Sequence, residues 1–317
     1  MGLRREYQRL RSTILGLVRI YSSEDTKSYT YNWWHEPADS FWIDRFIRSK
    51  IQPRQPINYY SCFGPKVWCI RKHRGHKIFF SGENLDSSRF PKYRDCRNKE
   101  VDLAIGFEFR TEANYYRFPL WIIQRDFISP TATLEDIKQL IQRLNNPSTR
   151  LSPKRDKFAV LVASHDHGKL RGRLADLISP LGMVDFGGKF RKNTNDLKEK
   201  YGDVKEEFLR NYRFNICPEN SLGDGYTTEK IFECIASGCI PIYWGAYLEP
   251  GILNPDAILR YEEGKEEELY ERVRTLWEDE EAYRQFAEIP PFVDGAAERI
   301  WEMIQGLETR LRAIIKE

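Results

Sequence analysis

The stretch YRFNICPENSLGDGYTTEKIFECIASGCIPIYWG, residues 212–245, decides the fold of this 317-residue chain. Apolar residues alternate with polar ones over 212–217 and stop at Pro218, which is typical of a short strand that ends at a proline. Residues 221–225, Ser-Leu-Gly-Asp-Gly, are rich in turn formers and predict a loop after this strand.

The second half of the stretch has the signals of a helix followed by a strand. Thr227 or Thr228 is a suitable N-cap, and the apolar residues after it predict one buried helix face. Gly238 ends the helix, and the apolar run 240–244 predicts a buried strand. The whole stretch is therefore a strand–loop–helix–strand unit.

The loop and the start of the helix suggest a site for an anion. A glycine-containing loop that leads into a helix N-terminus presents unpaired N–H groups and the positive end of the helix dipole. Lys230 lies in that first turn, where the dipole disfavours a cation, and an anionic ligand would remove the conflict. Glu229, beside it, can accept hydrogen bonds from sugar hydroxyls. The combination suggests a nucleotide-diphosphate pocket formed by Asn220, Tyr226, Glu229 and Lys230. The alternative is an ordinary βαβ unit with a solvated Glu229–Lys230 pair.

This stretch resembles the donor-binding signature of glycosyltransferase family 10, the α-1,3/1,4-fucosyltransferases. The matching parts are Phe214, the pair Glu219-Asn220, the segment Tyr226-Thr227-Thr228-Glu229-Lys230 and the strand Pro241–Gly245. Pro218 departs from the family pattern, since members usually carry an aromatic residue before the Glu-Asn pair. The shape of the loop at Pro218 is therefore left open.

The resemblance implies a GDP-fucose donor held by Asn220, Tyr226, Glu229 and Lys230. It also gives a role to Arg191, which follows the glycine pair 187–188 and aligns with a family arginine that binds the donor phosphates. The other interpretation of Arg191 is a basic residue in a solvated loop.

A second carboxylate stands directly after a strand pattern in the first half of the chain. Residues 77–80 are followed by Ser81-Gly82-Glu83-Asn84, and ligands bind beyond the carboxyl ends of the strands in open α/β sheets. The segment is similar to the family's aromatic-x-Gly-Glu-Asn stretch, which implies that Glu83 is the catalytic base. Without the resemblance, the favoured interpretation of Glu83 is a loop carboxylate that pairs with Arg71 or Arg74.

Strand and helix patterns alternate along the chain and indicate an α/β protein. Strands are expected at 57–63, 77–80, 101–107, 120–123, 158–163 and 183–186, with helices at 134–144, 266–277, 280–286 and 297–315. With the resemblance, this predicts a GT-B fold, two Rossmann-like domains facing each other across a cleft. The expected division is an acceptor-side domain 1–150, a donor-binding domain 151–295 and a C-terminal helix 296–317 that packs back on the first domain.

The amino-acid composition limits the kinds of partner that this protein is expected to bind. With 50 basic and 47 acidic residues, the formal charge of +3 is too small to indicate nucleic acid. No run of apolar residues is long enough to span a membrane, and the resemblance to bacterial members implies a cytoplasmic protein. The basic residues 2–18 fit either peripheral membrane contact or a terminal element packed on the body. The six cysteines lack zinc spacing and are expected to be buried free thiols.

No metal or other cofactor is expected to be required. His165-x-His167 has no nearby third ligand, and no two aspartates are separated by a single residue. By resemblance, Mn²⁺ or Mg²⁺ could still stimulate the reaction. The implied reaction is an inverting transfer of L-fucose from GDP-fucose to the 3- or 4-hydroxyl of a GlcNAc-type sugar. The alternatives are another nucleotide sugar on the same scaffold, or a non-catalytic carbohydrate- or nucleotide-binding module.

Overall fold

The structure is a computed structural model that describes Leu10, Ile14 and residues 26–32, 38–63, 73–97 and 100–315. The basic segment 2–18 lies outside these residues apart from Leu10 and Ile14. The chain divides into two compact units. The first comprises residues 1–133, 223–226 and 301–317, and the second comprises residues 134–222 and 227–300. The division thus falls after Thr133, earlier than the expected boundary at 150–151, and the helix that begins at Leu134 belongs to the second unit.

The first unit contains a parallel sheet whose five strands follow one another in chain order. The strands are β1 (Ser28–Tyr31), β2 (Ile57–Tyr60), β3 (His76–Phe80), β4 (Leu103–Gly106) and β5 (Tyr115–Arg117). Strands β2 and β4 are buried at every position, as expected of parallel strands covered on both faces. All five carboxyl ends therefore meet at one edge of this sheet.

Aromatic side chains fill the layers around this sheet. On one side, α2 (Trp42–Lys50) and the short η1 (Ala38–Ser40) bring Phe41 edge-on to Tyr59 and Trp42 against Phe118. On the other, η3 (Pro91–Arg97) brings Tyr93 against Phe79 in a stacked pair. Helix α11 (Ala296–Ile314) joins the unit from Trp301 onward, where the carbonyl of Met303 accepts a hydrogen bond from Tyr116 at 2.8 Å.

The strand predicted at 120–123 is wrong. Leu120–Ile123 forms the helix α3, followed by η4 (Gln124–Asp126). A fully apolar run of four residues does not reveal its period, and Pro119 precedes it with φ of −72°, an angle from which a helix can start. The strands β1 and β5, which the sequence does not predict, are only four and three residues long.

The second unit contains a second parallel sheet, with the strand order β10-β9-β8-β6-β7. The strands are β6 (Lys157–Leu161), β7 (Val184–Phe186), β8 (Tyr212–Ile216), β9 (Ile240–Tyr243) and β10 (Leu259–Arg260). The helices are α4 (Leu134–Asn145), α5 (Leu170–Ile178), α6 (Asp196–Glu199), α7 (Lys205–Leu209), α8 (Glu229–Ser237), α9 (Glu266–Glu278) and α10 (Glu280–Glu288), with short η5 (Pro147–Thr149) and η6 (Pro255–Ala257). The strand–loop–helix–strand unit predicted at 212–245 is confirmed as β8, α8 and β9.

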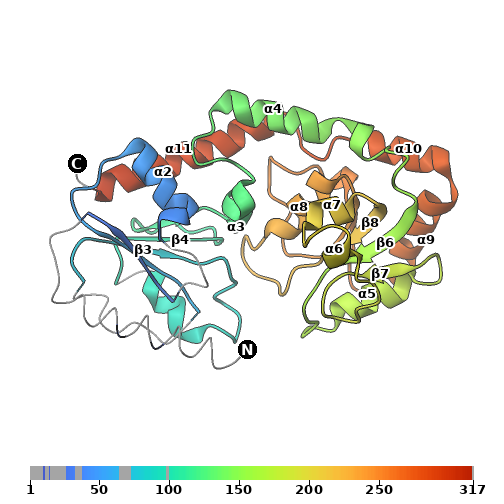
Figure 1. Cartoon of the computed structure of the whole chain (residues 1–317), viewed down its shortest axis with the longest axis horizontal. Coiled ribbons are helices and arrows are strands. Elements are labelled where there is room, and N and C mark those ends of the chain that lie inside the picture. Colours follow the sequence, from blue (N-terminus) through green and yellow to red (C-terminus); the bar gives the residue numbers. More distant parts are fainter. Residues whose placement is uncertain are drawn as a thin grey trace. The chain divides into compact units, whose positions relative to one another are not determined.

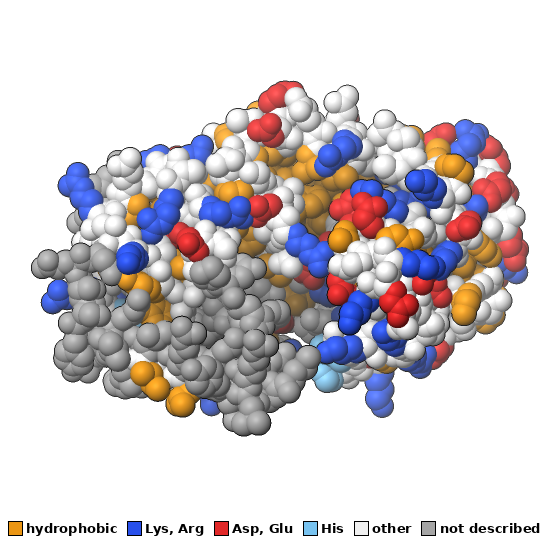
Figure 2. All heavy atoms as spheres, viewed as in Figure 1, with side chains coloured by type: hydrophobic (Ala, Val, Ile, Leu, Met, Phe, Trp, Pro, Cys, Tyr) orange, Lys and Arg blue, Asp and Glu red, His pale blue; other side chains and the backbone are white. Residues whose placement is uncertain are grey.

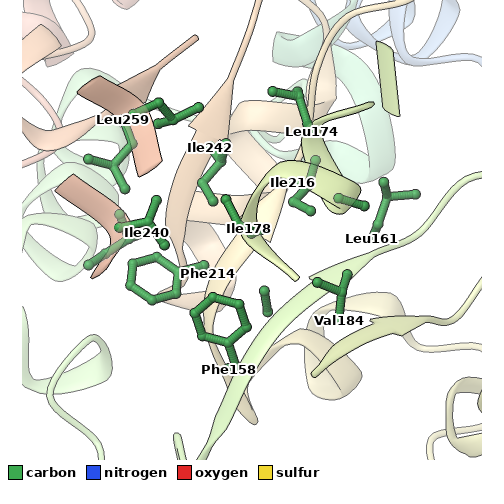
Figure 3. Packing of buried hydrophobic residues seen from close by; sticks show 14 of the residues in the cluster. Phe158, Leu161, Leu174, Ile178, Val184, Phe214, Ile216, Ile240, Ile242 and Leu259 are labelled. Carbon is green, nitrogen blue, oxygen red and sulfur yellow. The ribbon is translucent and has the colours of Figure 1, made fainter. Parts of the chain in front are cut away.

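The core of this unit lies between the sheet and the helices α5 and α9. Figure 3 shows alternate strand residues, among them Phe158, Phe214 and Ile242, pointing into one cluster with Leu174 and Ile178 of α5. Figure 1 shows α7 and α8 on the opposite side of the sheet from α5 and α9. Helices on both faces of a parallel sheet make a doubly wound unit. On the face seen in Figure 2, Lys and Arg side chains are interspersed with Asp and Glu over this unit, in keeping with the small net charge.

Two buried arginines, Arg150 and Arg155, fix the segment around the expected domain boundary at 150–151. The guanidinium of Arg150 donates to the carbonyls of Ala287, Leu144 and Asn145, and burial lowers its pKa to about 10. Arg155 donates to four acceptors, the carbonyls of Thr149, Tyr212 and Ser237 and the sulfur of Cys239. This segment is therefore an integral part of the second unit.

Among the described cysteines, the predicted buried free thiols are confirmed for Cys62, Cys217, Cys234 and Cys239. The described part of the chain contains no helix long and apolar enough to cross a membrane.

Candidate functional site

The topology of the second sheet makes the carboxyl ends of β6 and β8 the candidate ligand site. In the order β7-β6-β8-β9-β10, the first strand of the unit lies between the second and the third, so connections leave β6 and β8 in opposite directions. In doubly wound sheets, ligands bind outside the carboxyl ends of the two strands where this reversal occurs. The loops at that position are 162–169, after β6, and 217–228, after β8.

The carboxylate of Glu219 occupies the N-terminus of α8. Its oxygens accept hydrogen bonds from the backbone N–H of Thr228, the N-cap residue, at 2.7 Å and from the Thr228 hydroxyl at 2.8 Å. The Glu219 side chain is fully buried, with 0% exposed area. The position predicted for an anionic ligand at this helix end thus holds a carboxylate of the chain itself, which satisfies one of the unpaired N–H groups.

Lys230 forms an ion pair with this carboxylate. Its amine lies 3.0 Å from Oε2 of Glu219 and 2.7 Å from the hydroxyl oxygen of Thr228, and 17% of its side chain is exposed. The carboxylate of Glu229 is 3.7 Å from the same amine. Burial works to raise the pKa of Glu229, but the charges of Lys230 and Lys205 outweigh it and hold the pKa below its ordinary value. Glu229 is therefore ionised at neutral pH and able to accept hydrogen bonds.

Asn220 joins the two loops of the site. Its Oδ1 accepts a hydrogen bond from the guanidinium of Arg171 at 2.6 Å, and Arg171 also donates to the carbonyl of His165 at 2.6 Å. The carboxylate of Asp166 accepts from the backbone N–H groups of Arg171 and Gly172, at 3.1 and 2.8 Å. The N-termini of α5 and α8 thus both carry an acidic side chain of the protein.

Arg191 lies beside the start of α5. Its backbone has a φ of +47°, and its guanidinium forms a two-pronged ion pair with Asp176, which lowers the pKa of that carboxyl. A Cβ atom at Gly172 would lie 3.1 Å from Nη2 of Arg191, so the guanidinium packs closely over that glycine. The guanidinium of Arg191 therefore packs against the first turn of α5, the turn that also carries Arg171.

Tyr226 groups with the first unit. The four residues Gly223–Tyr226 belong to that unit, where the Tyr226 ring meets Phe107 edge-on with centroids 4.8 Å apart and is 2% exposed. The carboxylate of Asp224 accepts from the backbone N–H of Phe109 at 3.0 Å, and Arg117 donates to the carbonyl of Gly225 at 3.2 Å. The structure thus brings Asn220, Glu229, Lys230 and Arg191 to the carboxyl edge of one sheet and buries Tyr226 in the other unit.

Glu83 lies in a tight turn just beyond β3. The hydroxyl of Ser81 accepts from the backbone N–H of Glu83 at 3.1 Å and donates to its carbonyl at 2.8 Å, which fixes the backbone of the turn. Burial and then the charge of Glu83 raise the pKa of the Cys62 thiol to about 12. Of the two alternative partners predicted for Glu83, Arg71 lies outside the described residues.

The next residue, Asn84, connects this turn to the loop 223–226. A Cβ atom at Gly223 would lie 2.6 Å from Nδ2 of Asn84, so the two segments touch within the first unit. The donor-signature loop and the turn that carries Glu83 are therefore neighbours.

The histidine pair near the site stacks ring on ring. The ring centroids of His165 and His167 are 4.2 Å apart with an interplanar angle of 25°. Among the described residues, no group of three or more His, Cys, Asp and Glu side chains is arranged to hold a metal ion.

Glu219 and Arg171 are site residues that the sequence did not single out for these roles. Glu219 stands in the family motif, but its neighbours in sequence do not reveal that it caps α8. The sequence gives no signal for the role of Arg171, because its bond to Asn220 joins residues 49 positions apart.

Comparison with solved structures defines the fold class. The chain matches a crystal structure of an α1,3-fucosyltransferase with a TM-score of 0.65 at 22% identity, over 92% of this chain and 91% of the other. A crystal structure of an α1,3-fucosyltransferase with GDP-fucose matches with a TM-score of 0.62 at 21% identity, over 95% of this chain and 97% of the other. The predicted α/β class with two Rossmann-like units, the GT-B fold of glycosyltransferases, is confirmed.

The sequence comparisons define the family. The model described as glycosyltransferase family 10 (fucosyltransferase) C-term matches residues 151–290, and that of the α-(1,3)-fucosyltransferase FucT N-terminal domain matches residues 30–124. This chain belongs to glycosyltransferase family 10.

Curated relatives come from a bacterium and a plant. The α-(1,3)-fucosyltransferase FucT of Helicobacter pylori is 28% identical over 80% of this chain and 57% of its own length. The α-(1,4)-fucosyltransferase of Arabidopsis thaliana is 28% identical over 44% of this chain and 35% of its own length. The chain thus spans about half the length of the first of these relatives and less of the second.

Proposed function

We propose that this protein transfers L-fucose from GDP-fucose to a hydroxyl of a GlcNAc-type sugar, with inversion at the fucose anomeric carbon. The observation that carries the proposal is the family signature, with Asn220, Glu229 and Lys230, in the segment that follows β8 at the strand reversal of the second sheet. Family membership and the fucosyltransferase relatives support the same donor. The acceptor position, the 3- or the 4-hydroxyl, is the finer part of the proposal.

Glu83 acts as the base in the proposed reaction. The acceptor hydroxyl attacks the anomeric carbon of fucose while the bond from that carbon to the β-phosphate oxygen breaks. Glu83 takes the hydroxyl proton, and the electron pair of the broken bond leaves on GDP. Removing a proton in this way contributes about 10²–10⁴-fold to the rate. The position of Glu83 beyond the carboxyl end of β3 supports this assignment.

The second unit binds the donor in this proposal. Arg191 and Lys230 offset the charge that builds up on the departing diphosphate, while Glu229 accepts hydrogen bonds from the ribose. Asn220 and Arg171 hold the two loops in register beneath the phosphates. Because Tyr226 is buried on Phe107, we assign it to holding the loop 223–226 beside the Glu83 turn, not to contacting the ribose.

No metal ion is needed in this scheme. The arginine and lysine side chains are fixed positive charges that can neutralise a diphosphate without a bridging cation. We expect transfer to retain at least about a third of its rate in excess EDTA, because fixed side-chain charges do the neutralising. Mn²⁺ could still stimulate modestly by pairing with released GDP.

The test is a matrix of donors and acceptors. The purified protein is incubated with GDP-fucose, GDP-mannose, UDP-galactose and UDP-N-acetylglucosamine, each with and without Galβ1-3GlcNAc and Galβ1-4GlcNAc. The proposal expects an acceptor-dependent product with GDP-fucose alone. Product from another donor would support the rival transferase, and GDP binding with no product from any pair would support a non-catalytic module. Product on the first acceptor alone indicates the 4-hydroxyl, and product on the second alone indicates the 3-hydroxyl.

A further inference from the structure

The Glu219 carboxylate behaves as a built-in anion at the N-terminus of α8. It is fully buried and accepts hydrogen bonds from the Thr228 backbone, the Thr228 hydroxyl and the Lys230 amine. The hydroxyl of Tyr243 lies 3.4 Å from its Oε1. A negative charge at this position is stabilised by the helix dipole and by the N–H groups of the first turn. A donor phosphate is therefore not needed to complete this helix end.

The same carboxylate determines where the Lys230 amine points. A lysine side chain has four flexible carbon–carbon bonds, and fixing them in one geometry costs rotamer entropy. In this structure the amine is held from two directions, by Oε2 of Glu219 at 3.0 Å and by the Thr228 hydroxyl at 2.7 Å. The entropy is thus lost on folding and is not lost again when a ligand binds.

We propose that Glu219 is a positioning residue, which holds Lys230 and the first turn of α8 in the orientation that receives the donor diphosphate. Glu219 itself does not touch the donor. The inference rests on the proposed function, because it assumes that Lys230 meets a nucleoside diphosphate.

The charges around Lys230 determine how the removal of Glu219 would change the pH dependence of GDP affinity. Glu219 and Glu229 face the amine, and Lys205, which pairs with Glu233 at 2.6 Å, lies close enough to act on Glu229. Without the Glu219 charge, the half-buried amine sits at the positive end of a helix with only Glu229 as an acidic neighbour among these groups. Burial and the dipole both favour the neutral amine, so it loses its proton at lower pH than in the wild type.

The experiment is a double-mutant cycle on GDP affinity, measured by isothermal titration calorimetry at pH 7 and pH 9. Glu219→Gln keeps the size of the side chain and removes its charge. We expect it to weaken GDP binding about tenfold at pH 7, the loss of one charge-assisted contact, and more at pH 9. In a Lys230→Met background, Glu219→Gln should cause no further loss, because its effect passes through Lys230.

Two further variants make the result specific. Glu233→Gln breaks another ion pair of α8, with Lys205 of α7, whose side chains are 18% and 17% exposed, and should leave GDP affinity and its pH dependence unchanged. Thr228→Val removes the hydroxyl that bridges Glu219 and Lys230 while keeping the backbone N–H, so it serves the same cycle if Glu219→Gln does not fold.

An equal loss with and without Lys230 would show that Glu219 is only a helix cap and would overturn the inference. If GDP affinity in Glu219→Gln depends on pH as it does in the wild type, the inference is also overturned. If the wild-type protein does not bind GDP at all, the proposed function fails together with the inference. If it binds GDP and the cycle is additive, only the inference fails.

Discussion

The guanidinium of Arg171 donates a hydrogen bond to Oδ1 of Asn220 at 2.6 Å, which joins the loops after β6 and β8 where the strand order reverses. Both loops border the crevice in which doubly wound sheets bind their ligands. A charge-assisted bond of this kind is stronger than a neutral one and restricts both loops at once.

Arg171→Met should weaken GDP binding by about tenfold or more, because it removes a charge-assisted hydrogen bond between the two loops. Titration calorimetry at neutral pH measures the effect. Arg173→Met is the matched control, since Arg173 lies on the same helix and contacts Tyr261 and Glu263. Equal losses in both variants would mean that the Arg171–Asn220 bond has no special role in donor binding.

Glu83→Gln should lower the turnover number by about 10² or more and leave GDP affinity within about threefold, because only proton removal is lost. Steady-state kinetics and calorimetry on the same preparation measure the two quantities. Asp86→Asn, an exposed carboxylate in the same loop, should keep the wild-type turnover. Turnover near the wild-type value in Glu83→Gln would remove Glu83 from the chemistry.

Gly225→Ala should destabilise the protein and displace the loop 223–226. Gly225 has a φ of +61°, and a Cβ atom there would lie 2.2 Å from the carbonyl oxygen of Phe107. Gly251→Ala is the control, because Gly251 has a φ of +70° but no atom within 4 Å of its Cβ position. The melting temperature of Gly225→Ala should fall at least about 3 °C further than that of Gly251→Ala, since only the first adds a steric clash to the backbone strain. Equal melting temperatures would show that the loop does not pack on Phe107 in solution.

Arg155→Ala should destabilise the second unit by about 3–5 kcal/mol, because it leaves several buried acceptors without a donor. Urea unfolding followed by tryptophan fluorescence measures the change. Arg155→Lys should recover only part of the loss, since one amine cannot reach acceptors on three different segments. Wild-type stability in the alanine variant would contradict the hydrogen bonds assigned to this side chain.

Local patterns in the sequence predict the second unit well. The alternation before Pro218, the threonine cap and Gly238 are short-range signals, and they yield β8, α8 and β9 at their observed places. The first unit is less predictable, because β5 has only three residues and the apolar run Leu120–Ile123 carries no clear period. The loop after β8 is predicted, but the packing of residues 223–226 in the first unit is not, since their partners Asn84 and Phe109 are more than a hundred residues away.

In the candidate site, too, local sequence signals are informative and contacts between distant residues are not predictable. The helix-start pattern suggests Lys230, and the family resemblance gives roles to Glu83 and Arg191. Pairing between distant residues determines how each side chain is held. Lys230 was expected to face a ligand anion, and the structure shows it bonded to Glu219, eleven residues earlier. Such a pair depends on how two loops fold over a sheet, which no local window of the sequence contains.

The most direct test of the central claim is a proton NMR time course of GDP-fucose with Galβ1-4GlcNAc and Galβ1-3GlcNAc in excess EDTA. The account predicts that the β-anomeric signal of the donor fucose declines as an α-fucosyl signal of a trisaccharide grows, with inversion and without added metal. An unchanged donor signal, a product with the donor's configuration, or transfer that appears only after metal is added would contradict it.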